Sequence, residues 1–477
     1  MCALASVMVS TRATTSGRLA FVSAVAAFAV VMLGTTLPTP LYSIYGAQMG
    51  FGVVTTTIVF AVYAAGVIVA LVAFGRWSDL IGRRPLLNAG AVLSAASAVV
   101  FLTAGPEWQL IVGRVLSGLS AGIYAGTATA AVIELAPPAW RHRAPAIATA
   151  ANMGGLGLGP LLAGLLAEYV PNPLRTPFVV DLVLLAVVGV GLWFLPEPVA
   201  VRPGARLSLQ RLSVPAEVRA VFIRAAIAAF AGFAVLGTFS GMAPTFLARV
   251  IGVDDHAVAG VLVATIFVVS AAAQIASRPI PTERALIAGC ALLIIGVALL
   301  MGALIAASLP LLFVGAVVTG VGQGFSFGKG LAAVVGASPA DRRAEVTSTY
   351  FVVAYVAMSI PIVGQGLAAA RWDLGTVGVA FDAGVGVLAL VALLLTIGAV
   401  VRSRPPLVEQ ATSTTPLVEP TTSTAPLVEP TTSTAPLVEQ ATSAPPLVEQ
   451  ATSAARSRVE ANNPTPPPHQ NPHAPAG

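Results

Sequence analysis

The chain has 477 residues, of which 56% are hydrophobic and only 9% are charged, with a net charge of +5. Water-soluble domains contain about 25% charged residues, so this composition excludes a soluble globular protein. No charged residue occurs between Arg18 and Arg76, and one bilayer crossing takes about 20 apolar residues. The sequence therefore predicts an integral membrane protein with several spans.

The apolar segments predict an all-α polytopic fold of twelve transmembrane helices in two groups of six. They are expected near residues 19–41, 53–75, 86–105, 109–135, 144–167 and 177–195, and near 225–248, 257–276, 285–307, 310–335, 347–369 and 376–401. The first follows Arg12 and Arg18, as in a signal peptide, but it has no small-residue cleavage site and is predicted to be retained. The expected domains are two six-helix bundles, 19–197 and 225–401, joined by a linker over 198–224.

The arginines predict how these spans are oriented, because cytoplasmic loops of membrane proteins are rich in Lys and Arg. With the N-terminus inside, eighteen arginines lie on the inner side, and only Arg175, Arg249 and Arg371 lie in outer loops. Both termini, residues 1–18 and 402–477, are therefore predicted to be cytoplasmic, in a multi-pass protein of the plasma membrane.

The C-terminal segment repeats every ten residues from about Pro406, beginning PLVEQATSTT and PLVEPTTSTA. Pro, Thr, Ser and Glu with one Leu-Val pair in each repeat cannot bury a core. The tail is predicted to be disordered.

Several classes of function are excluded by what the spans lack. Basic residues fall in short gaps between apolar segments, which indicates orientation signals rather than nucleic-acid binding. The two cysteines, Cys2 and Cys290, are too few for a disulfide framework, and none of the four histidines lies in a span. The spans offer no nucleophile–base pair and no metal cluster, so neither an enzyme nor a cofactor is expected.

The two halves resemble each other at a nearly constant offset. Pro138-Ala139-x-Arg141 recurs 201 residues later as Pro339-Ala340-x-Arg342, and Asp181 matches Asp382 at the same offset. Four glycines of the fourth span recur 202 residues later in the tenth; they are Gly113, Gly118, Gly122 and Gly126. Six helices in each half with one orientation make a parallel repeat, which is typical of transporters.

The loop between the second and third spans reads Gly75-Arg76-Trp77-Ser78-Asp79-Leu80-Ile81-Gly82-Arg83-Arg84. It resembles motif A of the major facilitator superfamily, G-x-x-x-D-x-x-G-R-R, which in that family secures the cytoplasmic gate. The resemblance implies gating roles for these residues: Gly75, Asp79, Gly82, Arg83 and Arg84. Glu134-x-x-Pro137-x-x-x-Arg141 also resembles a family signature, and Glu134 is expected to pair with Arg141, Arg143 or a motif A arginine.

The fourth and fifth spans carry two further resemblances. Arg114 lies in a segment similar to motif B, which implies a part in coupling; snorkelling to the outer surface is the alternative. Gly155-x-x-x-Gly159-Pro160-x-x-Ala163-Gly164 resembles motif C, which in this family marks exporters that exchange a substrate for protons. Small residues at this spacing allow helices to pack closely.

Proton coupling requires a titratable group, and the first span has none. Asp181 and Asp382 lie near the outer ends of the sixth and twelfth spans and are candidates for coupling. Asp181 is placed to pair with Arg114, whereas Asp382 lacks a matching arginine, so burial would favour its protonated form.

The family's plan places the first, fourth, seventh and tenth spans around a central cavity. It nominates seven substrate-binding residues, namely Thr35, Thr36, Tyr124, Thr238, Gln323, Ser326 and Lys329. Lys329 either snorkels or binds an anionic group. The resemblance implies a monomeric twelve-helix transporter that exports a small apolar molecule in exchange for protons by alternating access. Proton-coupled uptake of a metabolite is the first alternative, and a sensor or scaffold that does not transport is the second.

Overall fold

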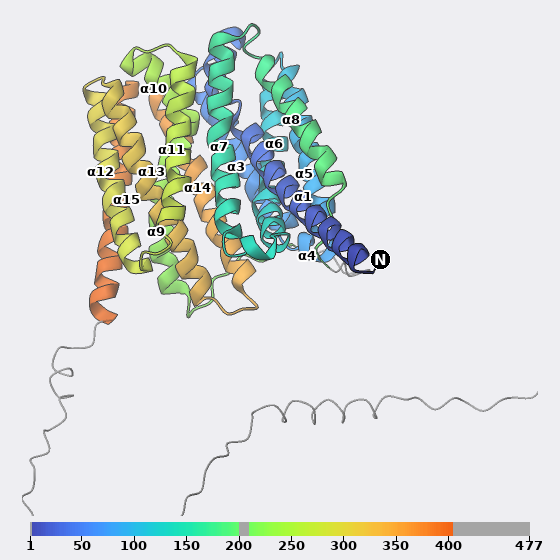
Figure 1. Cartoon of the computed structure of the whole chain (residues 1–477). Coiled ribbons are helices and arrows are strands. Elements are labelled where there is room, and N and C mark those ends of the chain that lie inside the picture. The colour runs from blue at the N-terminus through green and yellow to red at the C-terminus, as the bar shows by residue number, and fades with distance from the viewer. Residues whose placement is uncertain (1, 200–208, 404–477) are drawn as a thin grey trace, which may run out of the picture. The chain divides into compact units, whose positions relative to one another are not determined.

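The computed structural model describes residues 2–199 and 209–403 of the chain (Figure 1). These residues form helices and connecting turns, and no strand occurs among them. Residues 200–208 of the predicted linker and the predicted disordered tail from residue 404 lie outside the described residues.

Twelve segments are long and apolar enough to cross a membrane, which confirms the predicted number of spans. The first is Gly17–Met49, formed by most of α1 (Cys2–Thr36) with α2 (Tyr42–Met49). The other five of the first half are α3 (Val53–Phe74), α5 (Arg83–Leu102), α6 (Glu107–Glu134), α7 (Ala144–Tyr169) and α8 (Thr176–Trp193). The second half contains α9 (Arg219–Gly241), α11 (His256–Ala276), α12 (Thr282–Ile305), α13 (Leu309–Ala337), α14 (Arg343–Ala369) and α15 (Leu374–Ser403).

The helix bounds differ from the prediction mainly at the start of the chain. α1 begins at Cys2, although residues 1–18 were predicted as a separate cytoplasmic terminus. Residues 2–16 contain neither Gly nor Pro, so the strongest helix breakers are missing from this segment.

The internal repeat is visible where the first span of each half is broken. α1 ends before Pro38 and is followed by a 3₁₀ turn (Thr39–Leu41) and α2, because proline cannot supply the backbone donor that a continuing helix needs. α9 likewise ends before the short α10 (Ala243–Phe246) and a π-helical turn (Leu247–Ile251). Both breaks end in a left-handed glycine, Gly50 at φ 77° and Gly252 at φ 79°. These glycines lie 202 residues apart, which is the offset of the repeated sequence.

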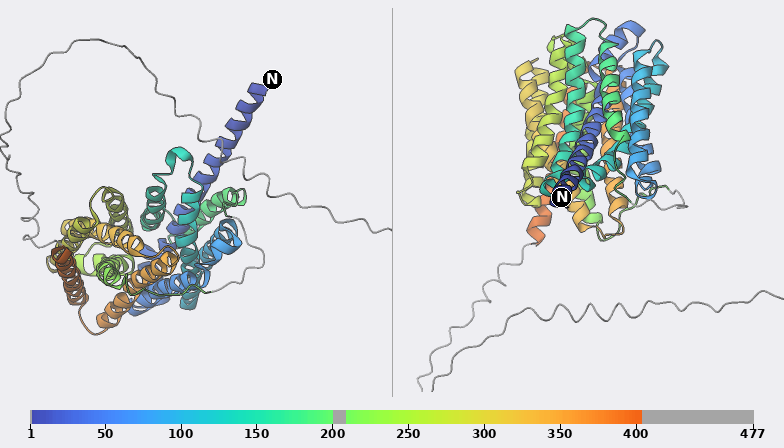
Figure 2. Two further views of the ribbon diagram at one scale, coloured as in Figure 1. Left: turned by 90° about the horizontal axis from the view of Figure 1, so that it is seen from below. Right: turned by 45° about the vertical axis from the view of Figure 1, so that its right-hand side comes forward.

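The two halves pack against each other through two pairs of helices. α7 packs on α11, and α3 packs on α14. Figure 1 shows α7 and α11 side by side in the centre of the molecule, and Figure 2 shows the helix bundle from below and from a second side. The end that carries α4 (Trp77–Ile81) is called the α4 end below, and the end that carries α10 is called the α10 end.

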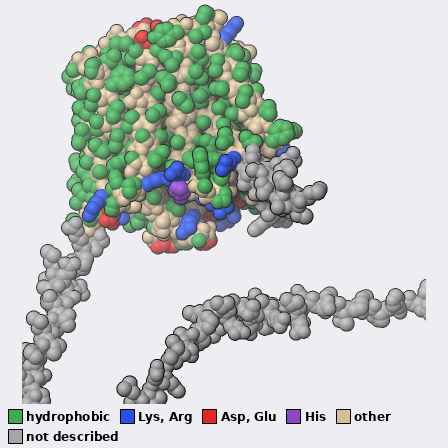
Figure 3. Space-filling view, viewed as in Figure 1, with side chains coloured by type: hydrophobic (Ala, Val, Ile, Leu, Met, Phe, Trp, Pro, Cys, Tyr) green, Lys and Arg blue, Asp and Glu red, His purple; other side chains and the backbone are tan. Residues whose placement is uncertain are grey.

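The outer surface of the helices suits a lipid environment. Large apolar side chains such as Val187, Leu394 and Ile360 are 60% or more exposed. In the space-filling view the hydrophobic side chains cover most of the face, while Lys and Arg gather toward the α4 end (Figure 3). The prediction places this α4 end in the cytoplasm.

Candidate functional site

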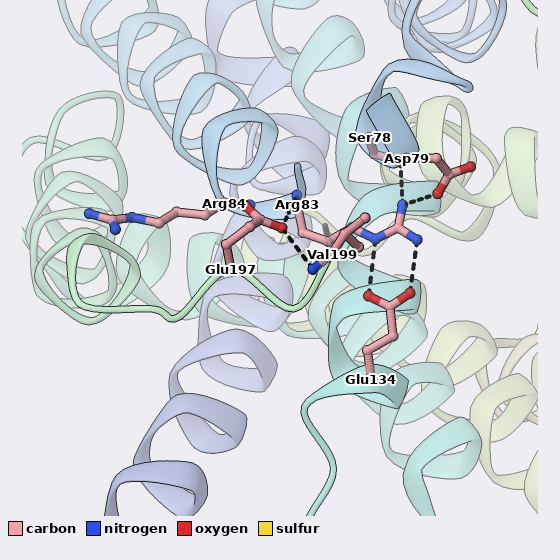
Figure 4. A network of polar contacts seen from close by, with 7 residues as sticks. All are labelled: Ser78, Asp79, Arg83, Arg84, Glu134, Glu197 and Val199. Carbon is pink, nitrogen blue, oxygen red and sulfur yellow. Dashed lines mark hydrogen bonds and ion pairs between the residues drawn. The ribbon is translucent and has the colours of Figure 1, made fainter. Parts of the chain in front are cut away.

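Arg83, the first residue of α5, is the centre of a charged network at the α4 end (Figure 4). Its Nε and Nη2 donate to the two carboxylate oxygens of Glu134 on α6, at 3.1 and 2.8 Å. Its Nη1 forms an ion pair of 2.6 Å with Asp79 and donates to the hydroxyl of Ser78, both on α4. A bidentate arginine–carboxylate contact fixes both side chains in one geometry. The network therefore joins α4, α5 and α6 within the first half.

A second carboxylate, Glu197, holds the start of α5. Its oxygens accept hydrogen bonds from the backbone N–H groups of Arg83, at 2.7 Å, and Arg84, at 3.0 Å. These are free donors at a helix N-terminus, where a negative charge is favourable. Gly82 precedes them at φ 104°, and a Cβ there would lie 2.4 Å from a Glu197 oxygen. Both the backbone angle and the carboxylate therefore require glycine at this position.

Of the other predicted gating residues, Arg84 and Gly75 contact neighbouring segments, whereas Arg141 does not join the network. Arg84 donates to the carbonyl oxygen of Trp193 at the end of α8, and Gly75 packs beside Gln210 of the linker. Arg141 is exposed to solvent, and Glu134 makes its ion pair with Arg83 rather than with Arg141. Of the three partners expected for Glu134, the structure selects the motif A arginine.

The described part of the linker touches both halves at the α4 end. The backbone N–H of Gln210 donates to the carbonyl of Val72 on α3, at 2.7 Å. Three residues later, the hydroxyl of Ser213 donates to a carboxylate oxygen of Glu345 on α14, at 2.8 Å. The linker thus contacts the end of α3 in the first half and the beginning of α14 in the second half.

The glycine stripe of α7 makes close contacts on two sides. Toward α1, a Cβ on Gly155 would lie 2.5 Å from the carbonyl of Ala29, and one on Gly159 would lie 2.3 Å from the carbonyl of Leu33. Toward α11, a Cβ on Gly164 would lie 2.3 Å from the carbonyl of His256. Glycine at these positions permits backbones to touch.

This stripe also forms the contact between the halves at the α10 end. A Cβ on Gly260 of α11 would lie 2.4 Å from the carbonyl of Pro160, the proline inside α7. One turn nearer the surface, the His256 ring and its backbone N–H both contact a carboxylate oxygen of Glu168. The residues similar to motif C therefore lie where the two halves meet.

Arg114 is fully buried and does not snorkel to the surface. Its Nε donates to the hydroxyl of Tyr42 and its Nη1 donates to the carbonyl of Thr35, whereas its Nη2 has no hydrogen-bond partner among the described residues. Four aromatic rings lie 5.2–6.0 Å from its guanidinium carbon, those of Tyr42, Phe60, Tyr63 and Phe101. Cation–π attraction and hydrogen bonds thus hold this charge, in place of a carboxylate.

The ion pair considered between Arg114 and Asp181 does not form. Asp181 is buried on α8, and its carboxylate lies against Gly34, where a Cβ would be 2.8 Å from Oδ2. Gly34 and Thr35 are successive residues of α1 and point in different directions, so α1 separates the carboxylate from the arginine. Oδ1 of Asp181 has no hydrogen-bond partner among the described residues.

Asp382 is also buried, and it lines a cavity of about 30 Å³ inside the second half. Helices α9, α10, α12, α13 and α15 contribute the walls, and Thr238 is the other polar residue of the lining. The Thr238 hydroxyl accepts a hydrogen bond of 2.7 Å from Nε2 of Gln365 on α14. The two repeat-equivalent carboxylates are thus both buried in their own halves.

Most of the seven predicted substrate-binding residues make contacts within their own half of the molecule. Tyr124 donates to the carbonyl of Leu87 and Thr36 donates to the carbonyl of Leu156. Gln323 accepts from Ser270, and Ser326 lies against Gly289 of α12. Lys329 donates to the carbonyls of Arg278 and Ile280 in the loop after α11, so the three residues form no polar stripe toward the centre.

A further polar contact between the halves comes from tyrosines that the sequence did not indicate. Tyr63 on α3 interacts through its hydroxyl with Thr35 and with Tyr355 on α14. Thr35 is the predicted substrate residue that contacts Tyr63, whereas Thr238 accepts its hydrogen bond from Gln365 within the second half. Glu197, Gln365 and the two tyrosines were missed, although a glutamate between two prolines directly after the sixth span is a signal for Glu197.

Comparisons with known proteins agree with this architecture. A sequence model described as Major Facilitator Superfamily matches residues 19–360. The class D tetracycline resistance protein of Salmonella ordonez is 30% identical over 144 residues, which covers 30% of this chain and 35% of that protein. The inner membrane transport protein YajR of Escherichia coli K12 is 33% identical over 109 residues, 23% of each chain. The class E tetracycline resistance protein of Escherichia coli is 29% identical over 107 residues, 22% of this chain. The chain thus matches about a quarter to a third of the length of these relatives.

Solved structures share the fold at low sequence identity. The human organic anion transporter MFSD10 has a TM-score of 0.58 at 18% identity, covering 80% of this chain and 99% of that one. The nucleoside transporter NupG, solved as a variant, has a TM-score of 0.63 at 13% identity, covering 79% of this chain and 99% of that one.

Proposed function

Because this chain belongs to the major facilitator superfamily, we propose that this multi-pass membrane transporter exports a small, largely apolar molecule in exchange for protons. The observation that carries the proposal is the glycine stripe of α7, which resembles the exporter motif of the family. Its Gly164 and Pro160 meet α11 at the α10 end, so the stripe is placed where the two halves must separate during alternating access.

Two of the relatives support export. Both are tetracycline resistance proteins, and export of a drug is one means of resisting it. The scarcity of charged side chains in the spans favours a substrate with little charge.

The charged network supplies the second element of the mechanism. In the proposed orientation, with both termini in the cytoplasm, the α4 end faces the cytoplasm and the halves touch at the extracellular side. The Asp79 side chain is 62% exposed and, within the part of the chain that the structure describes, is bonded to Arg83 alone, so it can contact the second half when the cytoplasmic side closes. We assign the Asp79–Arg83–Glu134 network to that gate.

Proton-coupled uptake is the second candidate, because one relative favours it. The D-xylose-proton symporter-like 2 protein of Arabidopsis thaliana is 29% identical over 123 residues, 25% of this chain. The first span also lacks an acid, which removes one means of recognising a cationic drug.

Everted membrane vesicles that contain the full chain test the direction of transport. A proton gradient is generated by respiration and followed with a fluorescent acridine, and tetracycline and a panel of apolar drugs are then added. Export predicts that at least one compound partly dissipates the gradient and accumulates inside the vesicles. The Asp79→Asn variant at equal abundance is the control. If no compound accumulates in everted vesicles, while sugars accumulate in right-side-out vesicles, the export proposal is wrong and uptake is correct.

A further inference from the structure

We propose that Asp382 binds the coupling proton, and that water reaches it from a groove between α14 and α15 through the Gln365–Thr238 hydrogen bond. The coupling of this proton to transport rests on the proposed function. The binding of the proton by Asp382 is a separate property and can be tested separately.

The groove begins near the loop between α14 and α15, at the α10 end. It has a volume of about 540 Å³, and Trp372 and Thr376 line it near the loop, whereas Pro361 and Phe381 line it deeper in the molecule. Gln365 also lines it and is itself buried. The groove therefore extends from the end of the helices to the side chain that bonds Thr238.

The cavity around Asp382 lies directly beyond this hydrogen bond. Thr238 and Phe381 line the cavity, Phe381 also lines the groove, and Gln365 bonds Thr238 from the groove side. Phe381 thus lines both spaces, and the Gln365–Thr238 hydrogen bond joins a residue that lines the groove to one that lines the cavity. A water molecule needs about 10–15 Å³, so a cavity of about 30 Å³ has room for one or two waters beside the carboxylate.

Nothing in the surroundings compensates a negative charge on Asp382. It makes no ion pair or hydrogen bond with the described residues. None of the charged or titratable residues on the surrounding helices lines the cavity. These residues are Arg219 and Arg224 on α9, Arg249 before α11, Glu283, Arg284 and Cys290 on α12, Lys329 on α13, and Arg343, Glu345, Tyr350 and Tyr355 on α14.

The ligand chemistry favours a proton over a metal cation. Hard cations take about six to eight oxygen ligands, and the cavity offers one carboxylate and one hydroxyl. No group of three or more candidate metal ligands occurs in residues 2–199 and 209–403. An isolated buried carboxylate avoids the cost of its charge by binding a proton, which is the exchange that a proton-coupled transporter needs.

The repeat supplies a matched comparison. Asp181 occupies the equivalent place in the first half, but its carboxylate lies against Gly34 of α1. We infer that the second half carries the proton site because it combines the carboxylate with a cavity and a polar contact leading to a groove.

Infrared spectroscopy of the purified full chain in lipid nanodiscs tests proton binding without any transported substrate. Asp181 is also buried, and its Oδ1 has no hydrogen-bond partner among the described residues, so the measurement is made in an Asp181→Asn chain to remove the band that Asp181 would contribute. We expect this chain to keep a protonated-carboxyl band that titrates with pH, and we expect the further substitution Asp382→Asn to remove it. If the band and its titration persist in the double variant, the proton site is wrong, whatever the vesicle assay shows for export.

The route is tested by the rate at which this band shifts on transfer into heavy water. Gly364 lines the groove and a Cβ there would meet nothing within 4 Å, so Gly364→Trp is chosen to fill the groove. Gly384 on α15 is exposed, also has open space and does not line the groove, so Gly384→Trp is the matched control. We expect exchange to slow at least about tenfold in Gly364→Trp alone, because ordered water carries the proton. Equal exchange rates in the two variants would overturn the route.

Discussion

Replacing Gly164 with alanine should weaken the closure of the two halves at the α10 end. The added Cβ would lie 2.3 Å from the carbonyl oxygen of His256. Carbon and oxygen atoms do not approach this closely, so α7 and α11 would have to separate by about 1 Å. Overpacking of this kind costs about 1–3 kcal/mol, and the cost falls on the conformation in which the helices touch. The equilibrium should therefore shift by about 5- to 150-fold toward opening at this end.

Gly154 provides the control because it lies in the same helix and a Cβ there would meet nothing within 4 Å. Both substitutions raise helix propensity by about 1 kcal/mol, so their difference isolates the contact with α11. Spin labels at Tyr169→Cys and Asp254→Cys, in a chain with Cys2 and Cys290 replaced by serine, report the distance across the α10 end.

We expect Gly164→Ala to broaden the distance distribution toward longer values and Gly154→Ala to reproduce that of the parent chain. The exchange of substrate in proteoliposomes should change in parallel with the distances. If the two variants give the same distances and the same exchange, the glycine contact does not control this end of the molecule.

Three further outcomes are expected. Asp79→Asn should abolish gradient-driven transport at near-normal abundance in the membrane, because the Asp79 side chain is 62% exposed and its loss leaves Arg83 paired with Glu134; wild-type transport would limit motif A to a topology signal. A cysteine at Arg141 should be protected from an impermeant thiol reagent in intact cells while one at Asp254 is labelled, and the reverse pattern would invert the orientation. Truncation after Arg404 should leave abundance and transport unchanged, since the twelve spans end at Arg402; a truncated chain that fails to accumulate would contradict this.

The fold could be predicted because the bilayer imposes a simple rule on sequence. Each span had to be a run of about 20 apolar residues, and charged or Pro/Gly-rich breaks ended it. The extension of α1 to Cys2 escaped this rule, because helix propensity rather than hydropathy decides whether a helix continues into water. The matching left-handed glycines, Gly50 and Gly252, escaped because a backbone angle leaves no periodic pattern.

The site was predicted less completely, since a motif names residues but not their neighbours. Arg83 and Glu134 were both identified, but their bidentate contact depends on how α5 and α6 pack. Tyr124 and Ser326 lie in glycine-rich helices whose faces look alike in sequence, and only the structure shows that they contact α5 and α12. Glu197 lay outside every motif, so its hold on α5 required the folded chain.

The short strap between Gln210 and Ser213 limits how far the transporter can open. Gln210 is bonded to α3 and Ser213 to α14, and three residues of extended chain reach roughly 11 Å at most. While both hydrogen bonds persist, the distance between the end of α3 and the beginning of α14 is limited to about this length plus the length of the Ser213–Glu345 contact. A wider opening at the α4 end must first break one of these two hydrogen bonds, so the linker restricts how far this end opens.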